Sequence, residues 1–275
     1  MLFDTPEAVG ELARRMADVD VLADGVTALW EAVVGRRPDA ARVLVEAGAD
    51  PWRPLLGGWS PGRLSLAGPT PGLFAVPAGE SLTPAERTRA EEARRLTAAL
   101  GGLHDEGLGL ACVAEVDAAE AIRRLGATPA ADELVDAVLD DPFGPAPAAV
   151  DRLVGVTSVP GGCVVTQPWG FAPQTTGVLT RLSAGTVCYG LYANPKSGDQ
   201  GAIARDGTVE ASDLHPGGGP QEGDTSAEVL DAYLYRLDAV AYACAFAGLR
   251  PTDGRGVTGP PDAWVELPRS DHRRG

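Results

Sequence analysis

The chain has 275 residues, with 38 acidic against 23 basic residues and a formal charge of −15. This balance disfavours a nucleic-acid binder, because such proteins neutralise phosphates with a basic surface. The apolar fraction of 44% is typical of a globular chain. No apolar run approaches the roughly 18 residues needed to span a bilayer, and the N-terminus lacks the pattern of a secretory signal. We therefore expect a cytoplasmic protein of one or two domains that binds neither nucleic acid nor membrane.

The cysteines and histidines predict no metal site. The chain has four cysteines and three histidines, and no two cysteines form a C-x-x-C pair. Neither a zinc site nor a disulfide framework follows from this spacing. We expect no metal and no cofactor.

A repeat is visible near the N-terminus. Residues 24–50 predict two short helices, and Gly48 lies where a left-handed residue commonly ends a helix. The same residue types recur 33 positions later, in the pairs Gly25 and Gly58, Thr27 and Ser60, Val33 and Leu66, and Gly35 and Gly68.

The motif G-x-T-A-L-x-x-A, followed by V-L-V-x-A-G-A-D, resembles the ankyrin repeat. The chain departs from the family at Ala28, where a proline is usual, and at Trp30, where a histidine is usual. Residues 6–16 are similar to the end of a preceding repeat and residues 58–61 to the start of another. A generic helical hairpin is the alternative. Because about three repeats are needed for a continuous core, we expect the stack in residues 1–79 to dock on the rest of the chain.

The remainder of the chain predicts an α+β domain over residues 80–275. The Pro- and Gly-rich residues 61–79 predict irregular structure or a linker, and residues 141–147 predict a loop. Helix-start patterns lie near residues 84, 118, 129 and 176, and one long final helix is predicted over 226–248. Alternating or β-branched runs predict a small, mainly antiparallel sheet with strands at residues 152–159, 162–167, 186–193, 201–205 and 208–212.

A second resemblance covers residues 105–250. The segments Leu110 to Val113, 118–126, 161–165, 169–171 and 182–186 resemble an actinobacterial domain family of unknown function. The resemblance implies a folded domain that follows ankyrin-type repeats in the chain, and it implies no established activity.

The residue types needed for catalysis are sparse. Asp213 and His215 are close enough in sequence to form an acid–base pair, but an exposed histidine at the start of a loop is the interpretation we favour. Cys163 and Cys188 lie in predicted strands, where a cysteine is usually a small buried hydrophobe. The glycines at 217–219 lack the context of a phosphate-binding loop. We predict no catalytic residue and no enzymatic activity.

Aromatic residues supply the candidates for binding. Trp52 falls at the finger of the repeat, and interfaces are enriched in Trp, Tyr and Arg, so Trp52, Arg53 and Trp59 are the predicted partner-contacting residues. The alternative is that these tryptophans cap the short stack. In the second region, the residues at the mouth of the sheet either line a pocket or pack under the final helix; they are Trp169, Tyr189, Tyr192, Asn194 and Lys196.

The leading functional prediction is a non-enzymatic interaction protein with an ankyrin-like face. Its acidic surface favours a basic protein partner, as in an inhibitor or immunity-like protein. One alternative is a sensor of a small molecule or peptide whose site lies where the two regions meet. Another is an unrecognised enzyme that uses Asp213, His215 or Cys188.

Overall fold

A computed structural model describes residues 5–103, 107–141, 150–194 and 196–269. The chain divides into two compact units, and each unit is built from two separate stretches of sequence. The first unit comprises the residues up to Arg94 together with Gly218–Leu237, and the second comprises Arg95–Gly217 together with the residues from Asp238 onward. The first unit thus contains residues 80–94 and 218–237, which the sequence analysis assigned to the second domain.

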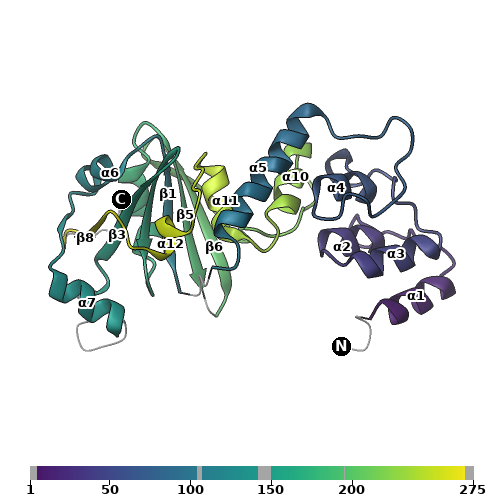
Figure 1. Cartoon of the computed structure of the whole chain (residues 1–275), viewed down its shortest axis with the longest axis horizontal. Coiled ribbons are helices and arrows are strands. Elements are labelled where there is room, and N and C mark those ends of the chain that lie inside the picture. The colour runs from purple at the N-terminus through teal and green to yellow at the C-terminus, as the bar shows by residue number, and fades with distance from the viewer. Residues whose placement is uncertain (1–4, 104–106, 142–149, 195, 270–275) are drawn as a thin grey trace. The chain divides into compact units, whose positions relative to one another are not determined.

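The first unit is helical (Figure 1). Its elements are α1 (Pro6–Arg15), α2 (Ala28–Val34), α3 (Pro38–Glu46), the 3-10 turn η1 (Leu56–Gly58), α4 (Pro61–Ala67), the first part of α5 (Pro84–Leu100) and α10 (Ser226–Leu234). α3 contacts α1 and α2, and α2 also contacts α4. α10 contacts η1 and α4 and so completes the packing of this unit from far along the chain.

The recurrence at 33 residues is visible in the geometry of the first unit. α2 begins at residue 28 and ends at 34, and α4 begins at 61 and ends at 67. The hydroxyls of Thr27 and Ser60 cap these helices by accepting the backbone N–H three residues further on, at 3.2 and 3.1 Å. Gly25 and Gly58, two residues before each cap, have φ angles of 79° and 77°.

Residues 61–67 correct one expectation, because they form a helix where irregular structure or a linker was predicted. Pro61 occupies the first helical position, where its missing N–H costs nothing, and Ser60 supplies the cap. Leu64 is fully buried. Local capping and core burial therefore outweigh the high content of proline and glycine.

The second unit is built on an eight-stranded sheet with the order β2-β8-β3-β4-β1-β5-β6-β7, in which all neighbours are antiparallel. The strands are β1 (Gly109–Ala114), β2 (Thr128–Pro129), β3 (Leu153–Val159), β4 (Gly162–Gln167), β5 (Val187–Asn194), β6 (Gly198–Arg205), β7 (Thr208–Asp213) and β8 (Ala263–Glu266). Its helical elements are the end of α5, α6 (Ala118–Leu125), α7 (Asp132–Asp140), η2 (Ala172–Gln174), α9 (Thr176–Leu182), α11 (Ala239–Phe246) and α12 (Arg255–Thr258).

Side chains from the two faces of the sheet enter different cores, because successive residues of a strand point to opposite sides. On one face Val113, between Cys163 and Cys188 of the flanking strands, packs in the core to which α6 and α9 contribute. On the other face Cys112 lies opposite Tyr189, and these residues contact α11. Both faces of the central strands are therefore buried.

The mixed α+β class is confirmed, but the sheet is larger than predicted. β1, β2 and β8 were not predicted as strands. Thr128 and Pro129, predicted as the start of a helix, pair instead with Glu266 and Val265 of β8, and the helix begins at Asp132. Most of the loop predicted at 141–147 lies outside the described residues.

The single final helix predicted over 226–248 is wrong. α10 ends at Leu234 and α11 begins at Ala239. Between them Leu237 has a φ of 65° and is 81% exposed, although its spacing from Leu230 and Leu234 would place all three on one stripe of a continuous helix. The guanidinium of Arg36 donates to the Leu234 carbonyl at 3.1 Å and so satisfies one of the carbonyls left free where α10 ends.

Candidate functional site

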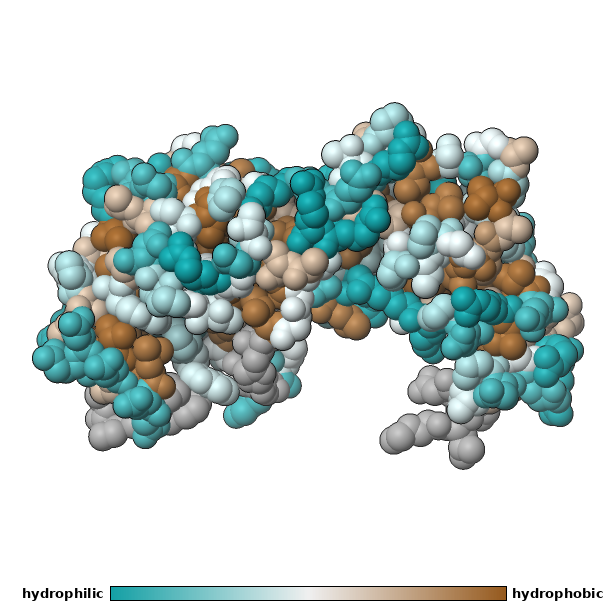
Figure 2. Space-filling model, viewed as in Figure 1, coloured by the Kyte–Doolittle hydropathy of each residue, from teal (hydrophilic) through white to brown (hydrophobic). Residues whose placement is uncertain are grey.

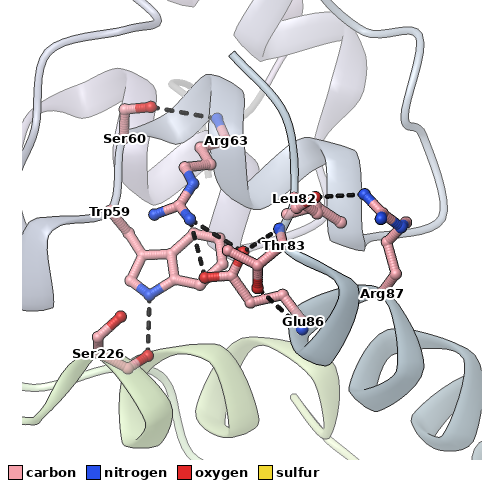
Figure 3. A network of polar contacts seen from close by, with 8 residues as sticks. All are labelled: Trp59, Ser60, Arg63, Leu82, Thr83, Glu86, Arg87 and Ser226. Carbon is pink, nitrogen blue, oxygen red and sulfur yellow. Dashed lines mark hydrogen bonds and ion pairs between the residues drawn. The ribbon is translucent and has the colours of Figure 1, made fainter. Parts of the chain in front are cut away.

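Trp59 lies at the centre of a polar network inside the first unit (Figure 3). Its side chain is 0% exposed, and its indole N–H donates to the backbone carbonyl of Ser226, at the start of α10, at 2.8 Å. The ring therefore has no free surface for a partner. Of the two interpretations of this tryptophan, its position supports the structural one.

Arg63 and Glu86 extend this network to α5 (Figure 3). The guanidinium carbon of Arg63 lies 4.5 Å from the centre of a Trp59 ring, within the range of a cation–π contact. Nη2 of Arg63 lies 2.8 and 2.9 Å from the two carboxylate oxygens of Glu86. Glu86 also accepts the backbone N–H of Thr83 at 2.8 Å, while Thr83 accepts that of Glu86 at 3.2 Å. The network joins α4, α5 and α10, so its function is to hold the first unit together.

Two turns of the first unit are hydrogen-bonded to each other, and we call residues 18–24 and 50–53 together the turn surface. The Asp20 carboxylate accepts the backbone N–H of Asp50 at 3.0 Å. Arg53, 33 positions after Asp20, donates from Nη1 to the Asp20 carbonyl at 2.9 Å. The carboxylates of Asp18 and Asp50 each accept the N–H two residues further on, at 2.9 and 2.8 Å. Successive turns of the repeat are thus fixed to one another.

The large hydrophobic residues exposed on the turn surface are Val21 and Leu22, at 51% and 47%. Trp52 is half-buried and packs against α4, since a Cβ added at Gly62 would lie 2.9 Å from the indole. Arg53 is also half-buried. The predicted contact residues Trp52 and Arg53 therefore support the turn surface, and Val21 and Leu22 project from it. The adjacent apolar residues Val21 and Leu22, inside the acidic run D-V-D-V-L-A-D, are the sequence signal that was missed.

A second exposed group lies at one end of the sheet, on the loop that follows β4. Trp169 and Phe171 are 41% and 45% exposed, and the ring of Phe171 lies 6.0 Å from that of Tyr192. Trp169 has a φ of 54°, which is unusual for a bulky residue. Buried Gln167 anchors the loop, because its amide accepts the N–H of Ala172 at 2.8 Å and donates to backbone carbonyls near the start of β3.

The five predicted pocket residues are not brought together as one lining. Tyr192 and Asn194 lie on one face of β5 and Tyr189 on the other, as strand alternation requires. Lys196 is exposed just beyond the strand, and its N–H bonds to the Asn194 side chain at 2.9 Å. Trp169 lies on the adjoining loop.

Tyr189 follows the alternative prediction and packs under a helix. Its ring lies 5.7 Å from that of Tyr242 and 5.1 Å from that of Phe246, both on α11. Its hydroxyl donates to the Asp213 carboxylate at 2.7 Å. Burial, followed by this hydrogen bond to an anion, raises the pKa of Tyr189 well above its usual value.

Asp213 and the cysteines, which were considered for catalysis, have structural contacts instead. The second oxygen of the Asp213 carboxylate accepts the backbone N–H of His215 at 2.9 Å, an arrangement distinct from a carboxylate bound to an imidazole. All four cysteines are buried, and Sγ of Cys112 and Sγ of Cys244 lie 3.6 Å apart. Burial raises the pKa of Cys163 to about 12, which disfavours a thiolate nucleophile.

Over the described ranges, no group of three or more His, Cys, Asp or Glu residues is arranged to hold a metal ion. Within the same residues, no helix has both the length and the hydropathy required to cross a membrane.

Comparisons of the chain with protein-family models, with curated proteins and with solved structures each gave no significant match.

Proposed function

We propose that the protein is a non-enzymatic binding protein and that its first unit, an ankyrin-like repeat stack, contacts another protein through the turn surface. The observation that carries this proposal is the pair of hydrogen bonds from Asp50 and Arg53 to Asp20, which fix two successive turns while leaving Val21 and Leu22 exposed. The 33-residue spacing of α2 and α4 and of their hydroxyl caps supports the ankyrin-like interpretation.

A rigid, exposed turn is well suited to binding. A surface that is already ordered loses less conformational entropy when a partner docks, so more of the contact energy contributes to affinity. The half-buried Trp52, which belongs to the second of the two turns and packs against Gly62 of α4, restricts the movement of that turn further. Truncating an exposed side chain at such a surface removes contact area without opening a cavity in the core.

The surface composition is consistent with a contact of modest area. On the face shown in Figure 2, hydrophobic residues gather in several small groups between hydrophilic ones. A non-obligate interface is only about as apolar as the rest of a protein surface, so reversible binding does not require a larger apolar patch than these.

The test is capture of partners from the organism that encodes the protein, followed by quantitative mass spectrometry. We expect Leu22→Ser to lose at least tenfold of a captured partner while its melting temperature stays within about 2 °C, since an exposed side chain contributes little to stability. Leu139→Ser, at a site in the second unit that is 53% exposed, is the matched control and retains capture. Equal capture by both variants and the wild type would contradict the proposal.

A second candidate function, recognition of a peptide or small molecule, is supported by the loop that carries Trp169 and Phe171. Gln167 holds this loop in place, and a left-handed φ at a bulky, exposed residue is the kind of strain found at functional sites. If the loop binds a ligand, a compound that raises the melting temperature of the wild type will have no effect on Phe171→Ser. A compound that stabilises both proteins equally binds elsewhere.

A further inference from the structure

We infer that the turn surface docks a basic protein segment in which an apolar side chain is flanked by arginine or lysine. This inference rests on the proposed function and specifies the chemistry of the partner. It follows from the placement of exposed carboxylates around the exposed pair Val21 and Leu22.

The carboxylates and the apolar side chains belong to the same two turns. Asp18 and Asp24 lie within four residues of Val21 and Leu22 in one turn. Asp50 joins them from the next turn, because its N–H is bonded to Asp20 at 3.0 Å. A segment that covers Val21 and Leu22 therefore meets carboxylates on both turns.

No other residue in the described part of the chain neutralises the negative charge of this surface. Asp18, Asp24 and Asp50 are exposed, and none of them forms an ion pair with a described residue. Arg53 is the one cationic residue of the turn surface, and it donates to the Asp20 carbonyl. Elsewhere in the first unit, by contrast, Asp39 pairs with Arg42 at 2.7 Å.

The two kinds of contact have different roles in this interface. Exposed charges interact over about 8 Å at physiological ionic strength, so the carboxylates speed the approach of a basic segment and select against acidic ones. Val21 and Leu22 supply the apolar area that is removed from water once the segment has docked. An acidic segment, or a basic one without an apolar side chain, fits only half of this surface.

The test uses the full chain and three fluorescent synthetic peptides of equal length. One alternates arginine with leucine, the second replaces arginine by glutamate, and the third replaces leucine by serine. Binding is followed by fluorescence anisotropy at 0.05 M and 0.15 M salt. We expect the Arg/Leu peptide to bind at least tenfold more tightly than either of the others at 0.15 M salt.

The decisive variant is the triple substitution Asp18→Asn, Asp24→Asn and Asp50→Asn. Asparagine retains the oxygen that accepts the turn hydrogen bonds of Asp18 and Asp50, and it tolerates the φ of 50° at Asp24. The triple variant therefore removes charge while preserving the turns. Its control is Glu133→Gln, Asp136→Asn and Asp140→Asn, which changes the net charge equally at exposed positions of α7.

We expect the turn variant to bind the Arg/Leu peptide at least tenfold more weakly and the α7 variant to bind within twofold of the wild type. Equal weakening in both variants would show that net charge attracts the peptide, and the inference would be overturned. It would also be overturned if the Arg/Ser peptide bound as tightly as the Arg/Leu peptide. A captured partner lost by Leu22→Ser and kept by the turn variant would refute the basic chemistry and leave the proposed function standing.

Discussion

The two units assemble their packed cores from the chain in different ways. In the first, helices near one another along the chain pack together, as α3 does with α1 and α2, and α10 then completes the group from more than a hundred residues away. In the second, pairs of consecutive strands such as β3 and β4 are joined by strands that come from elsewhere in the sequence: β1 lies between β4 and β5, and β8 lies between β2 and β3. A group of short helices thus forms a compact unit with the help of a helix from far along the chain, whereas the sheet buries both faces of its central strands with helices of its own unit.

The largest expected effect comes from deleting residues 1–79. This deletion removes Trp59 and Arg63 and exposes the buried residues Val229 and Leu230 of α10. In the remaining chain we expect residues 218–237 to lose protection against hydrogen exchange, while the sheet of the second unit keeps its protection. Unchanged protection over 218–237 would show that α10 is stable without residues 1–79, and would contradict the conclusion that α10 and the N-terminal helices form one unit.

Trp59→Ala should have the largest effect of any single substitution considered. It leaves a cavity at a fully buried ring and removes the hydrogen bond to Ser226, so we expect a loss of about 3–5 kcal/mol in the free energy of unfolding. Urea unfolding followed by circular dichroism measures this change. Trp52→Ala is the control, because its half-buried ring should cost less than half as much. Equal losses would place Trp52 in the core.

The ion pair between Arg63 and Glu86 should show a smaller energetic coupling. The two side chains are 24% and 17% exposed, so solvent screens them less than an exposed pair. A double-mutant cycle with Arg63→Met and Glu86→Gln should give a coupling of about 1–3 kcal/mol in the free energy of unfolding. The pair Arg42 and Asp39, exposed by 54% and 73%, is the comparison and should give less than about 0.5 kcal/mol. Similar values for both pairs would show that the network around Trp59 adds nothing beyond a surface contact.

The smallest predicted effects are at helix caps. The Thr225 side chain accepts the N–H of Glu228 in α10, and the Asp117 side chain accepts that of Glu120 in α6. Thr225→Ala and Asp117→Ala should each cost about 1 kcal/mol. Hydrogen exchange should locate the first loss in the first unit and the second loss in the second unit. If both substitutions lowered protection in both units alike, the two units would unfold as one.

Much of the fold could be predicted from local patterns. The strand over residues 162–167 and the helix beginning at Pro84 lie where the sequence predicted them, because a β-branched run and a helix-capping pattern are local signals. β8 was missed, since its four residues become a strand only by pairing with β2 and β3. The break at Leu237 was also missed, because apolar spacing continues through it and the division of the chain between two units does not show in periodicity.

The arrangement of the candidate site could be predicted only in part. The sequence pointed to residues 50–53, but Trp52 was taken for a contact group, whereas its ring packs against Gly62 of α4. The separation of Tyr189 from Tyr192 follows from strand alternation and could have been predicted. The burial of Trp59 could not, because its partner Ser226 lies 167 positions away.

The position of α10 has a consequence for biosynthesis. A ribosome makes the chain from its N-terminus, so the first repeat helices leave the exit tunnel long before Ser226 has been translated. Strands β1 to β7 are all synthesised in that interval, whereas β8 appears after α10. The first unit therefore cannot be completed until α10 has been made, and the residues that α10 covers stay exposed while most of the sheet is being synthesised. Domains usually fold in the order of their synthesis. Here the unit whose first residues are synthesised earlier can complete its fold only after seven of the eight strands of the other unit have been made.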